Sequence, residues 1–235
     1  MGLKIVGKST PFLDRHEAGR FLAQAMRAQA RGDLLVLGIP RGGVVVGAAV
    51  ARELAAELDV VIARKLSAPD NPELAIGAVI EGGETYLNRG LISALGADEK
   101  YVADETARQL ERIRQRAEAY RAVRGIAPRE GRTVVVVDDG VATGATMIAT
   151  LNGLRAAKPA RLWCAIPVGP QDTLEELDEL AGEVVCLAAP EYFQAVGQFY
   201  ERFDQVEDDE VIRILRTAQS LAQKRKEPNR KGAQP

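Results

Sequence analysis

Two residue types that build many catalytic and metal sites are scarce in this chain of 235 residues. It has one histidine, His16, and two cysteines, Cys164 and Cys186. Each cysteine lies in an apolar run, with no C-x-x-C pair or histidine cluster, so we expect no zinc site and two buried, reduced thiols. His16 falls among charged residues of a predicted helix, which favours a surface position over an acid–base role.

The sequence also lacks long hydrophobic segments and a strong net charge. No apolar run approaches the ~20 residues that a membrane-spanning helix needs, and residues 1–10 lack the apolar region of a signal peptide. The formal net charge of −2 provides no general attraction to nucleic acid. We therefore expect a cytoplasmic protein without a membrane partner, and a nucleic-acid partner is not favoured.

Two common nucleotide motifs are also absent. The sequence contains no G-x-x-x-x-G-K-[ST], and no G-x-G-x-x-G follows a predicted strand. Nucleoside triphosphatases and dinucleotide-dependent enzymes therefore lose support.

Aromatic residues are scarce as well. With 46% hydrophobic but only 5% aromatic residues, aliphatic side chains must fill the core.

The most informative segment that is present runs from Val134 to Thr146. Four consecutive valines, residues 134–137, are typical of a strand covered on both faces in a parallel sheet. Such a strand delivers the next residues to the carboxyl edge of the sheet, where α/β folds bind ligands. Those residues are Asp138 and Asp139, followed by the small-residue loop Ala142, Thr143, Gly144, Ala145 and Thr146, which opens a helix predicted over residues 145–157.

The chemistry of this loop suits a sugar phosphate. Free N–H groups at a helix start, with the hydroxyls of Thr143 and Thr146, can bind a phosphate dianion. The two carboxylates can accept hydrogen bonds from vicinal hydroxyls. We predict a ribose 5-phosphate ligand; the alternative is an ordinary strand–turn–helix with a solvated aspartate pair.

The segment from Val134 to Thr146 resembles the phosphoribosyl-pyrophosphate loop of type I phosphoribosyltransferases. The resemblance implies that Asp138 and Asp139 are the catalytic carboxylates that hold the ribose 2′- and 3′-hydroxyls, and that residues 142–146 hold the 5′-phosphate. It implies transfer of 5-phosphoribosyl from phosphoribosyl pyrophosphate to a nitrogen nucleophile, expected to be a nucleobase in nucleotide salvage. The implied cofactor is Mg²⁺, held mainly by substrate without a dedicated protein site.

A second apolar strand run, residues 34–39, ends in Pro40, Arg41, Gly42 and Gly43. In the family, the loop after the first sheet strand binds pyrophosphate through backbone amides, often around a non-proline cis peptide. By analogy that bond would be Pro40–Arg41. The Arg41 guanidinium can bind phosphate oxygens bidentately, and the alternative interpretation is a glycine-rich turn between strand and helix.

A third strand is predicted over residues 59–64, which places Lys65 beside the same sheet edge. Lys65 is a candidate to neutralise the leaving pyrophosphate, unless it belongs to a solvated strand end. This region also resembles a bacterial branch of predicted phosphoribosyltransferases, and the likeness covers about residues 12–221. The residues here that carry it are Arg64, Lys65, Pro69, Asn71, Pro72, Glu73, Ala75, Gly77 and Ala78.

The acceptor is less well defined. Enzymes of the family that use 6-oxopurines have an aspartate where this chain has Ala142, which argues against hypoxanthine or guanine. A hood over residues 189–206 is the expected base-recognition segment, and Phe193 is the first candidate to stack on a flat acceptor. The alternative is that these aromatic side chains belong to the core.

We predict an α/β fold with a parallel twisted sheet flanked by helices, in a single domain over residues 1–222. A long helical insertion is expected over residues 81–125 and a disordered tail over 223–235. The insertion is interpreted as a cover over the site or a dimer arm, so a homodimer is possible. The arginines of its long helix, residues 98–121, and the one just beyond could form a solvated face, a dimer contact or a nucleic-acid surface; they are Arg108, Arg112, Arg114, Arg116, Arg121 and Arg124.

A second class of function fits the same loop. Some relatives of this fold keep it while sensing phosphoribosyl pyrophosphate or a nucleotide to regulate transcription or bind RNA. The arginine-rich helix is the feature that favours such a sensor, whereas the slightly acidic overall charge argues against it.

Overall fold

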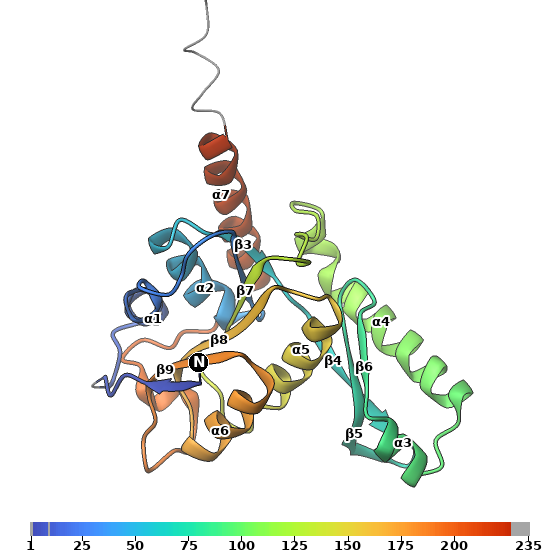
Figure 1. The fold of residues 1–235 in the computed structure, drawn as a ribbon. Helices are drawn as coiled ribbons and strands as arrows, with labels where there is room; N and C mark the ends of the chain where they lie inside the picture. The colour runs from blue at the N-terminus through green and yellow to red at the C-terminus, as the bar shows by residue number, and fades with distance from the viewer. Residues whose placement is uncertain (1, 9, 227–235) are drawn as a thin grey trace, which may run out of the picture.

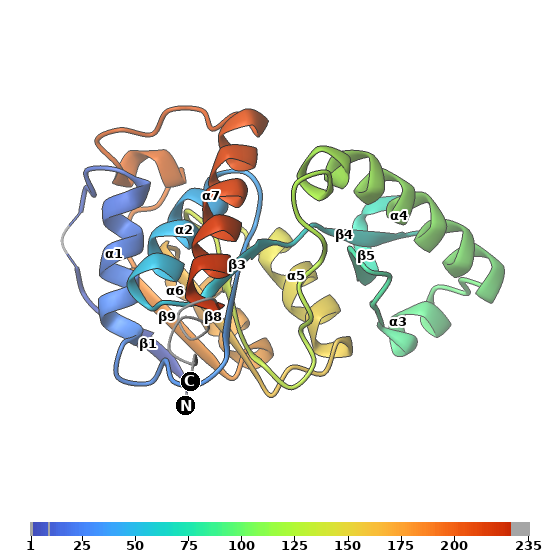
Figure 2. The same ribbon diagram turned by 90° about the horizontal axis from the view of Figure 1, so that it is seen from above.

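The structure, a computed structural model, describes residues 2–8 and 10–226. Figures 1 and 2 show a large sheet with helices on both faces and a smaller unit that projects to one side. Among the described residues, no helix combines the length and the apolar character that a membrane span requires.

The large sheet has six strands in the order β1-β9-β8-β7-β2-β3, and every neighbouring pair is parallel. These strands are β1 (Leu3–Ile5), β2 (Leu34–Gly38), β3 (Glu57–Val60), β7 (Thr133–Val137), β8 (Arg161–Val168) and β9 (Glu183–Ala188). Strands β2 and β7 lie side by side. The chain adds β3 outside β2, and later it adds β8 and then β9 outside β7. Adjacent strands β2 and β7 therefore form a topological switch point, where open α/β sheets leave a ligand crevice.

Helices cover both faces of this sheet, which explains its continuous apolar runs. On one face, Leu35 and Leu37 pack with the core of α5 (Ala145–Ala156) and α6 (Gln171–Leu180). On the other face, Leu34 and Val36 pack with α1 (Arg15–Met26) and α2 (Gly42–Glu53). Successive strand residues point to opposite faces, so a strand buried on both sides must be apolar throughout. The predicted α/β class with a helix-flanked parallel sheet is confirmed.

The smaller unit has an antiparallel sheet of its own, ordered β4-β5-β6, and two helices. Its elements are β4 (Ala63–Ala68), β5 (Asn71–Ile80), β6 (Thr85–Leu87), α3 (Arg89–Ala94) and α4 (Glu99–Arg121). Buried apolar residues of β4, β5 and α4 share a core with the last helix, α7 (Asp208–Lys226). In Figure 2 this unit lies beyond α5, away from α1.

Two of the predicted boundaries were wrong. The single strand expected over residues 59–64 is split, because β3 ends at Val60 and β4 begins at Ala63 in the second sheet. Val61 and Ile62 stay buried between them, so the apolar run in the sequence continues across the break. The projecting unit therefore begins at residue 63, well before the expected residue 81.

The C-terminal boundary also differs from the prediction. The tail was expected to begin at residue 223, but α7 continues to Lys226, and residues 227–235 lie outside the described part of the chain. The short elements β1 and α3 were not predicted. Three-residue and six-residue elements carry too little periodic pattern to be recognised in sequence.

The arginines around the long helix divide into two groups. Arg114 pairs with Glu111 on the exposed face of α4, as a solvated face predicts. Arg121 instead donates to Asp59 at 2.8 Å and to Glu81 at 2.6 Å. Asp59 is fully buried and also accepts a hydrogen bond from the Ala127 N–H. This network joins the end of α4 to β3 and to Glu81, the residue that follows β5.

The second arginine of the buried group is Arg124. It pairs with Glu57 and lies 3.5 Å from Asp59. The solvated-face interpretation was therefore wrong for Arg121 and Arg124, because both guanidinium groups have buried or half-buried carboxylate partners that are distant in sequence.

We predict that Asp59→Ala lowers the free energy of unfolding by about 3 kcal/mol, because it removes one carboxylate partner from half-buried Arg121 and buried Arg124. Urea unfolding measures the change. Glu111→Ala, which breaks an exposed pair, is the matched control and should leave the free energy of unfolding nearly unchanged. Equal stability of the two variants would contradict a structural role for the network.

Candidate active site

The site lies at the switch point, where β2 and β7 end side by side. Gly38 is opposite Val137 in the register, and the Ile39 N–H donates to the Val137 carbonyl at 2.9 Å. The loop after β2, residues 39–41, and the loop after β7, residues 138–144, therefore leave the sheet edge as neighbours. The two predicted phosphate loops are brought together by strand pairing.

Two glycines allow these loops to touch. A Cβ atom on Gly42 would lie 1.9 Å from Oδ2 of Asp139, and one on Gly43 would lie 2.9 Å from Oδ1 of Asp138. Both distances are too short for any side chain, so glycine is required at both positions. The Pro40–Arg41 bond just before them is cis, as the family resemblance implied.

The two carboxylates have different surroundings. Burial and the negative charge of Asp139 raise the pKa of the Asp138 carboxyl well above its usual range. Asp138 Oδ1 also accepts a hydrogen bond from the Asp139 N–H at 2.9 Å. Asp139 Oδ2 accepts a hydrogen bond from Nε of Arg15 at 2.7 Å. One carboxylate is thus held by backbone and the other by an arginine.

The small-residue loop presents an open helix start. Gly144 occupies the N-cap position of α5 in a left-handed conformation with φ of 70°, and it has no side chain to cap the first turn. The flanking residues Ala142, Thr143, Ala145 and Thr146 are all exposed. A helix start of this kind directs backbone N–H groups and the positive end of the helix dipole toward an anion.

Three residues at the site were missed by the sequence analysis. Arg15 binds Asp139, the Tyr200 hydroxyl donates to the Asp139 carbonyl at 2.6 Å, and the Thr173 hydroxyl donates to the Ala142 carbonyl at 2.9 Å. Each lies far from its partner in sequence. No local motif marks them, and only the fold brings them to the loop.

The loop after β2 also receives contacts from outside the large sheet. Arg41 pairs with Glu207 at 3.3 Å, and Arg116 of α4 donates to the Pro40 carbonyl at 3.4 Å. Tyr120, one turn beyond Arg116, donates a hydrogen bond to Asp208 at the start of α7. The long helix therefore lies directly against the predicted pyrophosphate loop, with basic side chains beside it.

Lys65 is placed differently from the prediction. It pairs with Ala78 inside the second sheet, because β4 has left the large sheet by that point. The predicted position at the end of a large-sheet strand was therefore wrong. A role for Lys65 in pyrophosphate binding stays a prediction.

Phe193 lies in the segment after β9, with its ring 5.2 Å from that of Phe199. It lines an open hollow of about 870 Å³ together with Ala142 and Thr143 of the small-residue loop and Thr173 of α6. The predicted hood residue and the predicted phosphate loop thus border the same space.

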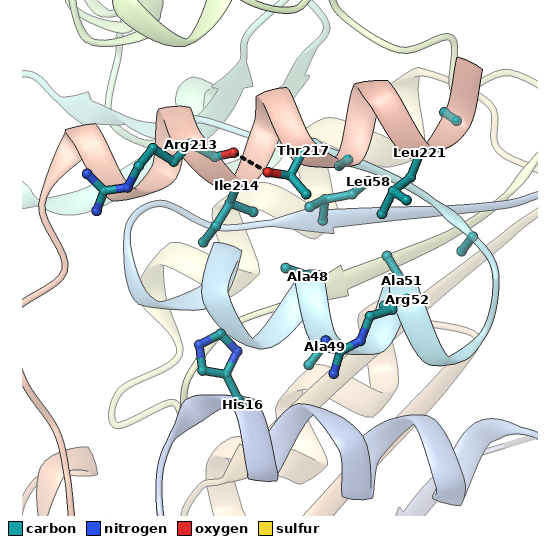
Figure 3. Close-up of a pocket in the computed structure, with 13 residues that line it drawn as sticks. His16, Ala48, Ala49, Ala51, Arg52, Leu58, Arg213, Ile214, Thr217 and Leu221 are labelled. Carbon is teal, nitrogen blue, oxygen red and sulfur yellow. Dashed lines mark hydrogen bonds between the residues drawn. The ribbon is translucent and has the colours of Figure 1, made fainter. Parts of the chain in front are cut away.

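A second hollow, of about 250 Å³, lies between α1, α2 and α7 and is separate from this site (Figure 3). His16 borders it next to α2, while Arg213 and Ile214 approach from α7. His16 is exposed, as expected, and none of the predicted site residues lines this hollow. The neighbouring Arg15 therefore turns toward the site while His16 turns away.

The cysteines match their expected state. Both are buried and free. Burial raises the pKa of Cys186 to about 12 and that of Cys164 well above its usual value. Both thiols are therefore protonated at neutral pH and are poor nucleophiles.

Comparison with known proteins identifies the family of this chain. The family model of the phosphoribosyl transferase domain matches residues 13–203. A Mycobacterium tuberculosis (strain CDC 1551 / Oshkosh) protein named "Putative phosphoribosyl transferase MT0597" is 44% identical over 204 residues, which is 87% of this chain and 46% of that protein. The chain thus spans about half the length of the curated relatives it matches.

Among solved structures, the crystal structure of TT1426 from Thermus thermophilus is 48% identical, with a TM-score of 0.82. The match covers 88% of this chain and 98% of that one. The residues that the family model matches include both loops at the switch point. The chain therefore belongs to the phosphoribosyl transferase domain family.

Proposed function

We propose that this protein transfers 5-phosphoribosyl from phosphoribosyl pyrophosphate to a nitrogen nucleophile, a nucleobase, and releases pyrophosphate. The observation that supports this most is the contact of Gly42 and Gly43 with Asp138 and Asp139. It places two carboxylates, the open helix start that follows them and the loop after β2 at one edge of the sheet. We propose that these three features bind the ribose hydroxyls, the 5′-phosphate and the pyrophosphate of phosphoribosyl pyrophosphate.

In the proposed complex the 5′-phosphate binds the start of α5, at residues 142–146. The Thr143 and Thr146 hydroxyls and the free N–H groups of the first turn supply donors. Asp138 and Asp139 accept hydrogen bonds from the ribose hydroxyls. The arrangement fixes the sugar, so C1 is oriented toward the loop after β2 and toward the acceptor.

The leaving pyrophosphate would bind Pro40, Arg41, Gly42 and Gly43. Bond breaking at C1 places negative charge on pyrophosphate and positive charge on the ribose ring, so preorganised donors and charges lower the barrier. Arg41 is the first candidate to neutralise the leaving group. Arg116 lies close to the same loop and adds positive charge.

Mg²⁺ fits the donors that the site provides. This ion is commonly bound by one or two carboxylates together with substrate phosphates and water, and Asp138 and Asp139 are carboxylates at the edge where the donor would lie. Within the described residues, no cluster of three or more metal-binding side chains forms a cage. The ion would neutralise charge on the departing pyrophosphate, and we propose that substrate oxygens supply most of its ligands.

We propose that the acceptor binds between Phe193 and the small-residue loop, in the hollow described above. The Phe193 ring is half-buried and supported by Phe199, so it can offer a flat apolar face. Ala142 leaves space at the position where 6-oxopurine enzymes have an aspartate. These features favour a base other than hypoxanthine or guanine.

The projecting unit is proposed to act as a cover. Helix α4 touches the loop after β2 through Arg116 and joins α7 through Tyr120 and Asp208. Ligand binding at that loop can therefore change the position or rigidity of the unit. Closure over the site would exclude water from the reacting centre.

The first test is pyrophosphate release from phosphoribosyl pyrophosphate and Mg²⁺ with a panel of purines, pyrimidines and other nitrogen nucleophiles. We expect release with one acceptor class, and its loss in Asp139→Asn. Asp104→Asn, an exposed change on α4, is the control and should retain turnover. Tight donor binding without release from any acceptor would instead favour a sensor.

We predict that Thr146→Ala weakens donor binding by about 1–2 kcal/mol, or about 5- to 30-fold in Kd, through loss of one hydrogen bond to phosphate. Isothermal titration calorimetry measures the change. Thr217→Ala, on α7 beside the second hollow, removes the same hydroxyl outside the site and should bind the donor like wild type. If both variants match wild type, the 5′-phosphate binds elsewhere.

For the cover, we predict slower amide hydrogen exchange in residues 66–100 when phosphoribosyl pyrophosphate and Mg²⁺ are added. Closure would shield β4–β6 and α3 and reduce their local opening. Residues 27–33, which precede β2 at the opposite edge of the large sheet, serve as the internal reference outside the unit. Unchanged exchange across residues 66–100, at a ligand concentration that saturates the site, would argue against a cover.

A further inference from the structure

Arg15 contacts Asp139 at the candidate site, but the proposed reaction gives it no role. It is the first residue of α1, and the Asp14 side chain caps this helix by accepting from the Glu17 N–H at 2.8 Å. Glu17 in turn accepts from the Leu13 N–H at 2.7 Å. These reciprocal bonds fix the helix start, so the Arg15 backbone is held in place before any ligand binds.

The Arg15 guanidinium joins three separate segments. Nε donates to Oδ2 of Asp139 at 2.7 Å, and Nη1 donates to the Asp204 carbonyl at 2.9 Å. Its central carbon lies 3.8 Å from the centre of the Phe203 ring. The side chains of Arg15 and Asp139 are only 11% and 16% exposed, so this ion pair is far better shielded than a surface pair.

Asp139 is restrained on its other sides as well. Its carbonyl accepts from the Tyr200 hydroxyl, and Gly42 lies so close to Oδ2 that no side chain fits between them. A carboxylate offers about four acceptor sites over its two oxygens. The bond from Arg15 uses one of these sites and the neighbouring Asp138 side chain contacts the same carboxylate, which leaves acceptor sites for ribose hydroxyls.

We propose that Arg15 is a positioning residue that holds Asp139 in the orientation required to bind the ribose hydroxyls, and that couples this carboxylate to the hood through Phe203 and Asp204. The inference rests on the proposed function. Arg15 also supplies a positive charge beside two adjacent carboxylates, which reduces their mutual repulsion. Arginine suits the role because one planar group donates to two partners while stacking on an aromatic ring.

The test compares two ligands by calorimetry, ribose 5-phosphate and inorganic phosphate. We expect both ligands to bind the start of α5, and only ribose 5-phosphate to bind Asp139 as well. We expect Arg15→Met to weaken ribose 5-phosphate binding about 10-fold or more, because Asp139 is then no longer held in its binding orientation, and to leave phosphate binding within about 2-fold. Unchanged phosphate binding would also show that the variant is folded.

Three further variants sharpen the result. Arg15→Lys keeps the charge without the planar fork and should restore part of the affinity. Arg20→Met, five positions later in the same helix, should bind both ligands like wild type. If Arg15 acts through Asp139, adding Arg15→Met to Asp139→Asn should cause little further loss of ribose 5-phosphate binding.

The outcomes distinguish failure of the proposed function from failure of the proposed role of Arg15. If the wild-type protein binds neither ribose 5-phosphate nor phosphoribosyl pyrophosphate, the proposed function is wrong and the role of Arg15 with it. If wild type binds but Arg15→Met binds ribose 5-phosphate equally well, only the role of Arg15 is wrong. Tighter binding by Arg15→Met would also overturn it, because Arg15 would then compete with the sugar for Asp139.

Discussion

The contact between the loops after β2 and β7 is the constraint on which the site depends. Parallel pairing of these strands places Gly42 and Gly43 against Asp138 and Asp139 with no space for a Cβ atom. A rigid sheet edge thus controls the separation of the two loops that we propose to bind anions. Because the proposed substrate carries phosphate groups on both sides of its ribose, this separation would determine how the sugar is held between them.

Around that contact, the site is assembled from segments that are distant in the chain. Arg15 comes from the first helix, Thr173 from α6 and Tyr200 from the segment after β9. All three bond to the loop after β7, either through Asp139 or through the Ala142 carbonyl. This loop is therefore supported from several elements, as precise ligand geometry requires.

The projecting unit is connected to the site by polar contacts at two places. At the end of α4, Arg121 binds buried Asp59 and Glu81, which joins the unit to the large sheet. Nearer its middle, α4 reaches the loop after β2 through Arg116. The first connection is shielded and strong, whereas the second is exposed and weaker. Such an arrangement permits movement near the site while the base of the unit stays anchored.

The sequence by itself determined strands β2, β7, β8 and β9 of the central sheet and the loops after β2 and β7. Strands buried on two faces must be continuously apolar, and loops suited to anions are small and glycine-rich. It therefore predicted that Asp138, Asp139 and Gly42 lie at one edge of the sheet, where the structure brings Gly42 against Asp139. Tertiary structure alone decided the break after Val60, the placement of Lys65 in a second sheet and the recruitment of Arg15. Residues on both sides of the break after Val60 are buried and apolar, so the sequence gives no sign that the chain passes to another sheet. Contacts between residues distant in the chain leave no local sequence pattern.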